Sequence, residues 1–117
     1  MIEHVLGVVA VNDFDMSHDW YQRFFDRPPT NTPMPGQLAE WKLTNNGWLQ
    51  IHRDPDRAGR SLFNLAVDDL DTHVRSLAAR QLEPTGTTEA NKGVRIASFT
   101  DPDHNIISLI ANFREKY

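Results

Sequence analysis

The sequence predicts an α+β fold made of two βαβββ modules, and this prediction depends on a repeat and on the patterns that follow it. Residues 9–15 read VAVNDFD and residues 65–71 read LAVDDLD, so the pattern returns after 56 residues (65 minus 9). In both copies an apolar, strand-like stretch runs into acidic residues, and a helix-like spacing of apolar residues comes next. Because the repeat distance is about half of the chain, we expect two similar modules.

The chain of 117 residues is expected to be a single domain over residues 1–117. We place the first module at about 2–54, a linker with the sequence PDRAGR at 55–60, and the second module at about 61–113. A chain of this size buries enough surface to fold alone, and dimerisation would add further burial. We therefore expect the two modules to act in a homodimer.

Each module is predicted to contain one helix, with acidic residues in front of it and proline after it. Acidic side chains at this place accept hydrogen bonds from free backbone N–H groups and favour the positive end of the helix. The acidic residues are Asp13 and Asp15 in the first module, and Asp69 and Asp71 in the second. The expected buried stripes are Met16, Trp20, Phe24 and Phe25 in the first helix, and Leu70, Val74, Leu77, Ala78 and Gln81 in the second.

A hairpin is predicted for QLAEWKLTNNGWLQIHRD, residues 37–54. A turn at Asn46-Gly47 would place Trp41 opposite His52, and a turn shifted by one residue would place Trp41 opposite Gln50. In both registers Leu49 and Ile51 face the helix. The other face is then expected to carry Ala39, Trp41, Leu43, Trp48, Gln50 and His52. In the second module, GVRIASFT and NIISLIAN form the matching hairpin across DPDH.

Composition and charge exclude several classes of function. The formal charge is −4, from 12 basic and 16 acidic residues, whereas nucleic-acid binders usually carry a basic surplus. The absence of cysteine excludes disulfides, thiolate metal ligands and a cysteine nucleophile, and it fits a reducing compartment. The run VLGVVAV is too short to span a bilayer, and MIEHV lacks the basic start of a secretion signal. We expect a cytoplasmic protein without nucleic-acid or membrane partners.

Several motifs resemble those of the vicinal oxygen chelate (VOC) superfamily, which includes glyoxalase I, extradiol dioxygenases, and fosfomycin and bleomycin resistance proteins. The motifs are VND and VDD at the strand-to-helix junctions and the longer stretches VNDFDMSHDWYQRFF and TDPDHNIISLI. The stretch AEWKL…GWLQIHRDP resembles the small glyoxalase-like branch of the superfamily. His104 replaces the usual glycine of the DPDG turn, and the glycine usual after the first helix is replaced near Asp26. The resemblance covers residues 2–113. It implies that two curved half-barrels, from one chain or from two, enclose a cavity.

The resemblance also implies where metal ligands would lie. The family's four ligand positions correspond here to Leu6, Gln50, Leu62 and Ser108. Leucine has no lone pair and a serine hydroxyl is a poor ligand for such an ion, so we expect no metal and no cofactor. One alternative remains. If the first and fourth strands pair antiparallel, His4 and His52 are neighbours and offer two imidazoles for a displaced metal or a shared proton.

The resulting expectation is a metal-free protein that binds or sequesters a small aromatic or amphipathic ligand in a concave cavity. Aromatic walls with a few polar groups are typical of small-molecule sites. No catalytic residue is assigned. One alternative is a lyase, isomerase or dioxygenase that uses His4 and His52, or His52 alone as a general base. Another is a dimeric scaffold whose cavity is packed shut. The expected ligand-binding residues are Leu6, Trp41, Trp48, Gln50, His52, Leu62 and Ser108.

Overall fold

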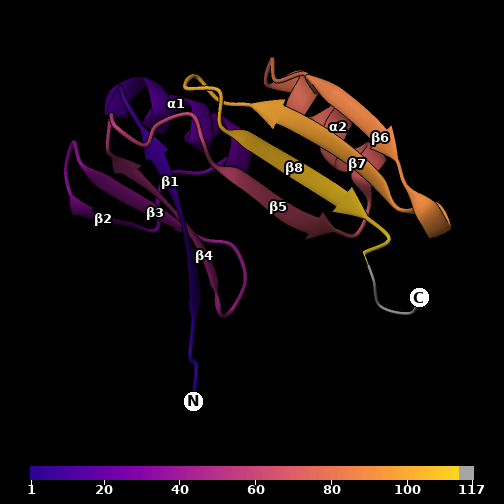
Figure 1. The fold of residues 1–117 in the computed structure, drawn as a ribbon, viewed down its shortest axis with the longest axis horizontal. Helices are drawn as coiled ribbons and strands as arrows, with labels where there is room; N and C mark the ends of the chain where they lie inside the picture. Colours follow the sequence, from indigo (N-terminus) through magenta and orange to yellow (C-terminus); the bar gives the residue numbers. More distant parts are fainter. Residues whose placement is uncertain (114–117) are drawn as a thin grey trace. The chain divides into compact units, whose positions relative to one another are not determined.

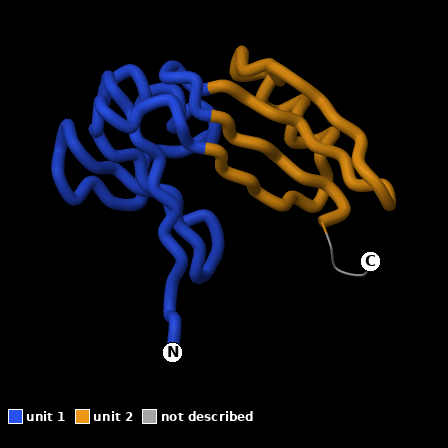
Figure 2. Tube along the Cα trace, viewed as in Figure 1, with its two compact units in different colours: residues 1–61, 101–105 blue, residues 62–100, 106–117 orange. Residues whose placement is uncertain are grey.

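The computed structural model describes residues 1–113, which form two compact units (Figure 2). Unit 1 comprises residues 1–61 and 101–105, and unit 2 comprises residues 62–100 and the segment from residue 106 onward. Each unit contains a helix and a four-stranded sheet in the order β-α-β-β-β, which confirms the predicted repetition of a βαβββ module. No helix within residues 1–113 is both long enough and apolar enough to cross a membrane.

In unit 1 the sheet order is β1-β4-β3-β2, with β1 parallel to β4 and the other pairs antiparallel (Figure 1). The helix begins after Asp13, whose carboxylate accepts from the Met16 backbone N–H at 3.1 Å. It ends at Asp26, which takes the left-handed conformation (φ 57°) usually given to glycine. The elements are β1 (Val5–Val11), α1 (Phe14–Phe25), β2 (Asn31–Met34), β3 (Leu38–Lys42) and β4 (Gly47–Arg53).

The core of unit 1 lies between α1 and one face of this sheet. The Trp41 ring lies 6.2 Å from that of Tyr21 and 5.7 Å from that of Phe25, between ring centroids. The predicted helical stripe is wrong in one respect, because Met16 is 56% exposed and Tyr21 is buried. Tyr21 can lie inside because its hydroxyl has a hydrogen-bond partner there. The buried helix residues are Phe14, Ser17, Trp20, Tyr21 and Phe24.

In unit 2 the sheet order is β5-β8-β7-β6, again with the first strand parallel to the last and the other pairs antiparallel. The second helix ends earlier than predicted, since Gln81 lies beyond it with φ 65°. Among the described residues, the unit's buried side chains include Leu77, Phe99 and Ile107. The elements are β5 (Leu62–Val67), α2 (Leu70–Ala79), β6 (Gly86–Glu89), the short η1 (Asn91–Gly93), β7 (Arg95–Thr100) and β8 (Ile106–Ala111).

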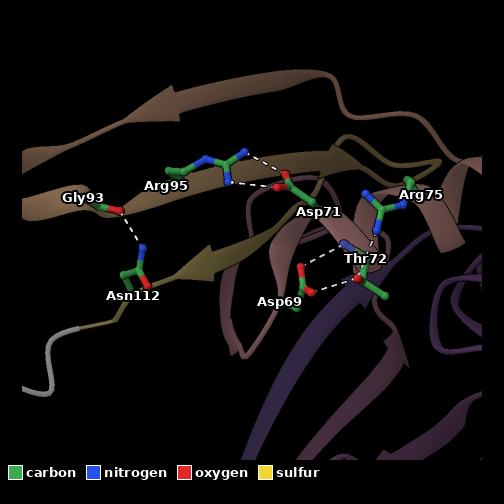
Figure 3. Close-up of polar contacts among 7 residues, drawn as sticks. All are labelled: Asp69, Asp71, Thr72, Arg75, Gly93, Arg95 and Asn112. Carbon is green, nitrogen blue, oxygen red and sulfur yellow. Dashed lines mark hydrogen bonds and ion pairs between the residues drawn. The ribbon is translucent and has the colours of Figure 1, made fainter.

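Two carboxylates at the start of α2 hold it in place (Figure 3). Asp69 caps the helix, accepting from the Thr72 backbone N–H at 3.1 Å and from Thr72 Oγ1 at 2.9 Å, and these bonds lower the pKa of Asp69. Asp71 accepts from Arg95 Nη2 on β7 at 2.9 Å, and this bond lowers the pKa of Asp71. The acidic residues before the helices therefore divide into caps, Asp13 and Asp69, and first-turn residues.

The register of the β3–β4 hairpin differs from both predicted registers. Trp41 lies opposite Leu49, so Thr44, Asn45 and Asn46 form a three-residue loop, closed by a 2.8 Å bond from the Leu43 N–H to the Gly47 carbonyl. Side chains alternate between faces, so a one-residue difference turns β3 over relative to β4. The expected position of Trp41 beside Gln50 is therefore wrong. Trp41 is fully buried on the helix side, where Nε1 donates to the Arg27 carbonyl at 3.0 Å.

Candidate functional site

The face of the unit 1 sheet that points away from α1 carries an exposed apolar strip. Leu6 and Val8 on β1 are 46% and 48% exposed. They pair with Trp48 and Gln50 on the parallel strand β4, which puts an indole and an amide beside two aliphatic side chains. Val9 and Ile51 alternate with these residues and are fully buried on the helix side. We call Leu6, Val8, Trp48 and Gln50 the open face of unit 1.

Gln50 is held in one orientation by a carboxylate on the next strand. Its Nε2 donates to Glu40 Oε2 at 3.0 Å, and Glu40 Oε1 accepts from Asn31 Nδ2 at 3.2 Å. An ionised carboxylate only accepts hydrogen bonds, so the amide must turn its nitrogen to Glu40. The amide oxygen of Gln50 then lies on the other side of the group, as an acceptor at the open face. Sequence reasoning missed Glu40 because it assigned β3 the wrong register.

Trp48 is also fixed in position. Its Nε1 donates to His4 Nδ1 at 3.1 Å, and the two rings meet edge to face at 6.2 Å. Lys42 Nζ lies 5.9 Å from the centre of the indole, within range of a cation–π contact. An indole restrained in this way offers a flat surface that loses little conformational freedom when a ligand stacks on it.

The predicted pairing of His4 with His52 is wrong. The strands β1 and β4 are parallel, so His4 precedes the pair Val5–Gly47 while His52 lies opposite Ala10 at the far end. About six residues of strand separate the two levels, or roughly 20 Å. No metal site or shared proton joins these two imidazoles.

The expected site residues of unit 2 lie on β5 and β8. Leu62 is 65% exposed and lies opposite Ile106, whereas Ser108 is buried with Oγ 2.8 Å from Ser98 Oγ. Ser108 also lies opposite Asn64, so a row of polar side chains crosses the three neighbouring strands β5, β8 and β7 at the level of Asn64, Ser108 and Ser98. The corresponding level in unit 1 is formed by Val8, Gln50 and Glu40.

Of the seven expected ligand-binding residues, the structure brings Leu6, Trp48 and Gln50 together. His52 lies on the same face at the end of β4. Trp41 lies on the opposite face, and Leu62 and Ser108 belong to the sheet of unit 2.

The residues at the four family ligand positions do not fit a divalent cation. Leu6 and Leu62 have no donor atom and the Ser108 hydroxyl is engaged with Ser98, which leaves the neutral amide oxygen of Gln50 as the one donor atom among the four positions. Such ions are held by imidazole and carboxylate groups with fixed geometry. No step that depends on a metal follows from this arrangement.

No family model and no curated protein matches the sequence. Among solved structures, a glyoxalase/bleomycin resistance protein from Catenulispora acidiphila is 30% identical, with a TM-score of 0.87 over 92% of this chain and 96% of the other. A bleomycin-binding protein complexed with bleomycin is 18% identical, with a TM-score of 0.73 over 93% and 98% of the two chains. The antibiotic-binding protein TnmS3 from a Streptomyces species is 24% identical, with a TM-score of 0.76 over 95% and 96%.

The last two proteins share the fold of this chain at low identity. The first combines that fold with an identity of 30% over nearly all of both chains. Together with two βαβββ modules and the DPDHN turn at residues 101–105, this similarity shows that the chain belongs to the glyoxalase/bleomycin resistance protein family of the VOC superfamily.

Proposed function

We propose that this protein binds or sequesters a small aromatic or amphipathic molecule, without a metal, on the open face of unit 1. The observation that carries the proposal is the restrained, half-buried indole of Trp48 beside the exposed side chains of Leu6 and Val8. The oriented amide of Gln50 supplies a polar group that fixes how the ligand lies. A mainly apolar surface with one or two placed polar groups is the usual composition of a small-molecule site.

Two proteins with this fold support the class of ligand. One was solved with bleomycin bound, and another is described as an antibiotic-binding protein. Both proteins are named for binding a molecule. A binding role suits this chain, because the positions of the family's metal ligands are occupied by Leu6, Gln50, Leu62 and Ser108.

Tryptophan fluorescence tests the proposal directly. Trp20 and Trp41 are buried, so a ligand on the open face should change the emission of Trp48 above all. In a titration with 2-naphthamide, an uncharged aromatic probe, the wild-type emission should change and saturate. Trp48→Phe should lose most of the signal but keep binding in calorimetry, because a phenyl ring still stacks. Trp48→Ala should bind 2-naphthamide about tenfold more weakly.

The matched control is Trp20→Phe, which alters a buried indole on the opposite side of the sheet. This variant should retain the fluorescence response. If 2-naphthamide and a panel of larger aromatic compounds leave the emission of the wild-type protein unchanged, the proposed function is wrong, and the scaffold alternative gains support.

We also propose that the protein is a cytoplasmic homodimer. Leu62 and Ile106 are exposed on the sheet of unit 2, and association of two chains would remove apolar surface of this kind from water. The absence of cysteine suits a reducing compartment. Sedimentation equilibrium tests the dimer, and a mass of one chain, 13.4 kDa, at micromolar concentration would contradict it.

A further inference from the structure

A separate hollow of about 320 Å³ lies in unit 1 beside the last residues of the open face. Val8 and His52 line it from the sheet, and the chain that follows β4 supplies charged and polar groups. These groups are Asp54, Arg57, Arg60 and Ser61.

The hollow carries a net positive charge, whereas the net charge of the whole chain is negative. Two guanidinium groups face a single carboxylate, although the chain as a whole carries −4. The carboxylate of Asp54 lies 3.7 Å from Arg57 Nε and offsets one of the positive charges. The guanidinium of Arg60 is therefore the surplus charge. Guanidinium groups present several N–H donors in a plane and bind carboxylates through paired hydrogen bonds.

The segment that carries the arginines is anchored in unit 1. The Ser61 N–H donates to Asn105 Oδ1 at 2.9 Å, and the Arg57 N–H donates to the Asp54 carbonyl at 3.1 Å. Gly59 packs against the Asp103 carbonyl so closely that a Cβ there would lie 2.5 Å from it. Arg60 thus extends from a backbone whose neighbours on both sides are held.

The hollow is continuous with the open face through Val8. Val8 pairs with Gln50 on β4 and also lines the hollow. His52 follows Gln50 by two residues on the same face of the strand, a distance of about 7 Å. His52 lies four residues beyond Trp48 on that face, a distance of about 13 Å, so a ligand whose ring packs on Trp48 would reach the hollow through a chain of a few atoms.

We propose that the ligand of the open face carries a carboxylate, which binds in this hollow to Arg60 with assistance from Arg57 and an N–H of His52. This assignment rests on the proposed function, and it narrows the ligand to an aromatic or amphipathic organic acid.

The test compares two probes that share a naphthyl ring and a three-carbon spacer and differ in charge: 4-(2-naphthyl)butanoate and 4-(2-naphthyl)butanamide. Both are titrated by Trp48 fluorescence at low salt. The wild-type protein should bind the acid about tenfold more tightly than the amide. Arg60→Gln should remove most of this advantage and leave the affinity for the amide unchanged. Arg57→Gln should have a smaller effect, because Arg57 is already near Asp54.

The matched control is Arg53→Gln, which removes the same charge from a residue of β4 that lines a different hollow with Asn12 and Asp13. This variant should keep the full preference for the acid. Equal affinities of the two probes for the wild-type protein, or equal losses in Arg53→Gln and Arg60→Gln, would overturn the assignment and leave the proposed function intact. If neither probe changes the emission, the proposed function fails and the assignment fails with it.

Discussion

The Tyr21 hydroxyl donates to Asp101 Oδ2 at 2.7 Å and connects α1 to a turn 80 residues later in the chain. Asp101 also accepts from Asn105 Nδ2 and from the backbone N–H groups of Asp103 and Asn105, all at 2.9 Å. Burial raises the pKa of Tyr21 far above its ordinary value, and the negative charge of Asp101 raises it further. The phenol therefore stays protonated and remains a hydrogen-bond donor. Its bond to Asp101 is one of the contacts that attach residues 101–105 to unit 1.

Replacing Tyr21 with phenylalanine should destabilise the protein by about 1–3 kcal/mol at pH 7. The ring is kept, but the buried carboxylate of Asp101 loses one donor. Urea unfolding followed by circular dichroism measures the difference. Equal stability of the two proteins would mean that the other three donors satisfy Asp101.

The same pair predicts a response to alkaline pH. The pKa of Tyr21 is raised in the folded state, so its contribution to stability is complete below the ordinary tyrosine pKa of about 10 and declines above it. Wild-type stability should therefore fall faster than that of Tyr21→Phe as the pH rises above 10. Melting temperatures between pH 8 and 11 provide the measurement, and parallel curves would contradict the prediction.

The close approach of Gly59 to the turn predicts a cost for any side chain at this position. Gly59 has φ +88°, and an added Cβ would lie 2.5 Å from the Asp103 carbonyl oxygen. Gly59→Ala should lower stability by about 2–4 kcal/mol, since a backbone strain and a clash are added together. Gly36→Ala is the control, with a similar φ of +76° and open space around the Cβ, and it should cost about 1 kcal/mol. Equal costs would show that the turn moves freely to accommodate the methyl group.

The ion pair between Asp71 and Arg95 predicts a response to acid. The hydrogen bond from Arg95 lowers the pKa of Asp71, so this contribution is present above the ordinary aspartate pKa of about 4 and is lost as the pH falls below it. Asp71→Asn should therefore show a shallower fall in melting temperature between pH 5 and 3. Asp15→Asn, at the matching first-turn position of α1, controls for the loss of an acidic group near a helix start. Identical slopes for Asp71→Asn and wild type would contradict the prediction.

The features that were predicted correctly from sequence depend on residues close together in the chain. The repeat and the caps at Asp13 and Asp69 each follow from a local pattern. The single domain over residues 1–117 stays a prediction, which one cooperative unfolding transition would support.

The errors concern pairing between strands. A three-residue loop instead of a two-residue turn placed Trp41 on the opposite face, and local residues did not distinguish these loop lengths. The direction of β1 relative to β4 depends on the whole module, which is why His4 and His52 were expected to meet. Glu40 was missed because its role depends on lying opposite Gln50.

The orientation of Gln50 predicts which polar groups a ligand should carry. Glu40 holds the amide nitrogen, so the amide oxygen of Gln50 should accept from a ligand donor. The wild-type protein should therefore bind 2-naphthamide, which donates, more tightly than 2-acetylnaphthalene, which only accepts. In Glu40→Gln the new side chain at position 40 can donate as well as accept, so the Gln50 amide can exchange the positions of its oxygen and nitrogen. The preference for 2-naphthamide over 2-acetylnaphthalene should then shrink by about fivefold.

Glu89→Gln, the same change of charge on β6 of unit 2, should leave the preference for 2-naphthamide unchanged. Fluorescence titration of the two probes with the wild-type protein and both variants measures these effects. If Glu40→Gln keeps the full preference, Gln50 does not take its orientation from Glu40. If both variants lose the preference equally, the effect is one of overall charge, and the open face selects its ligand by shape and apolar contact alone.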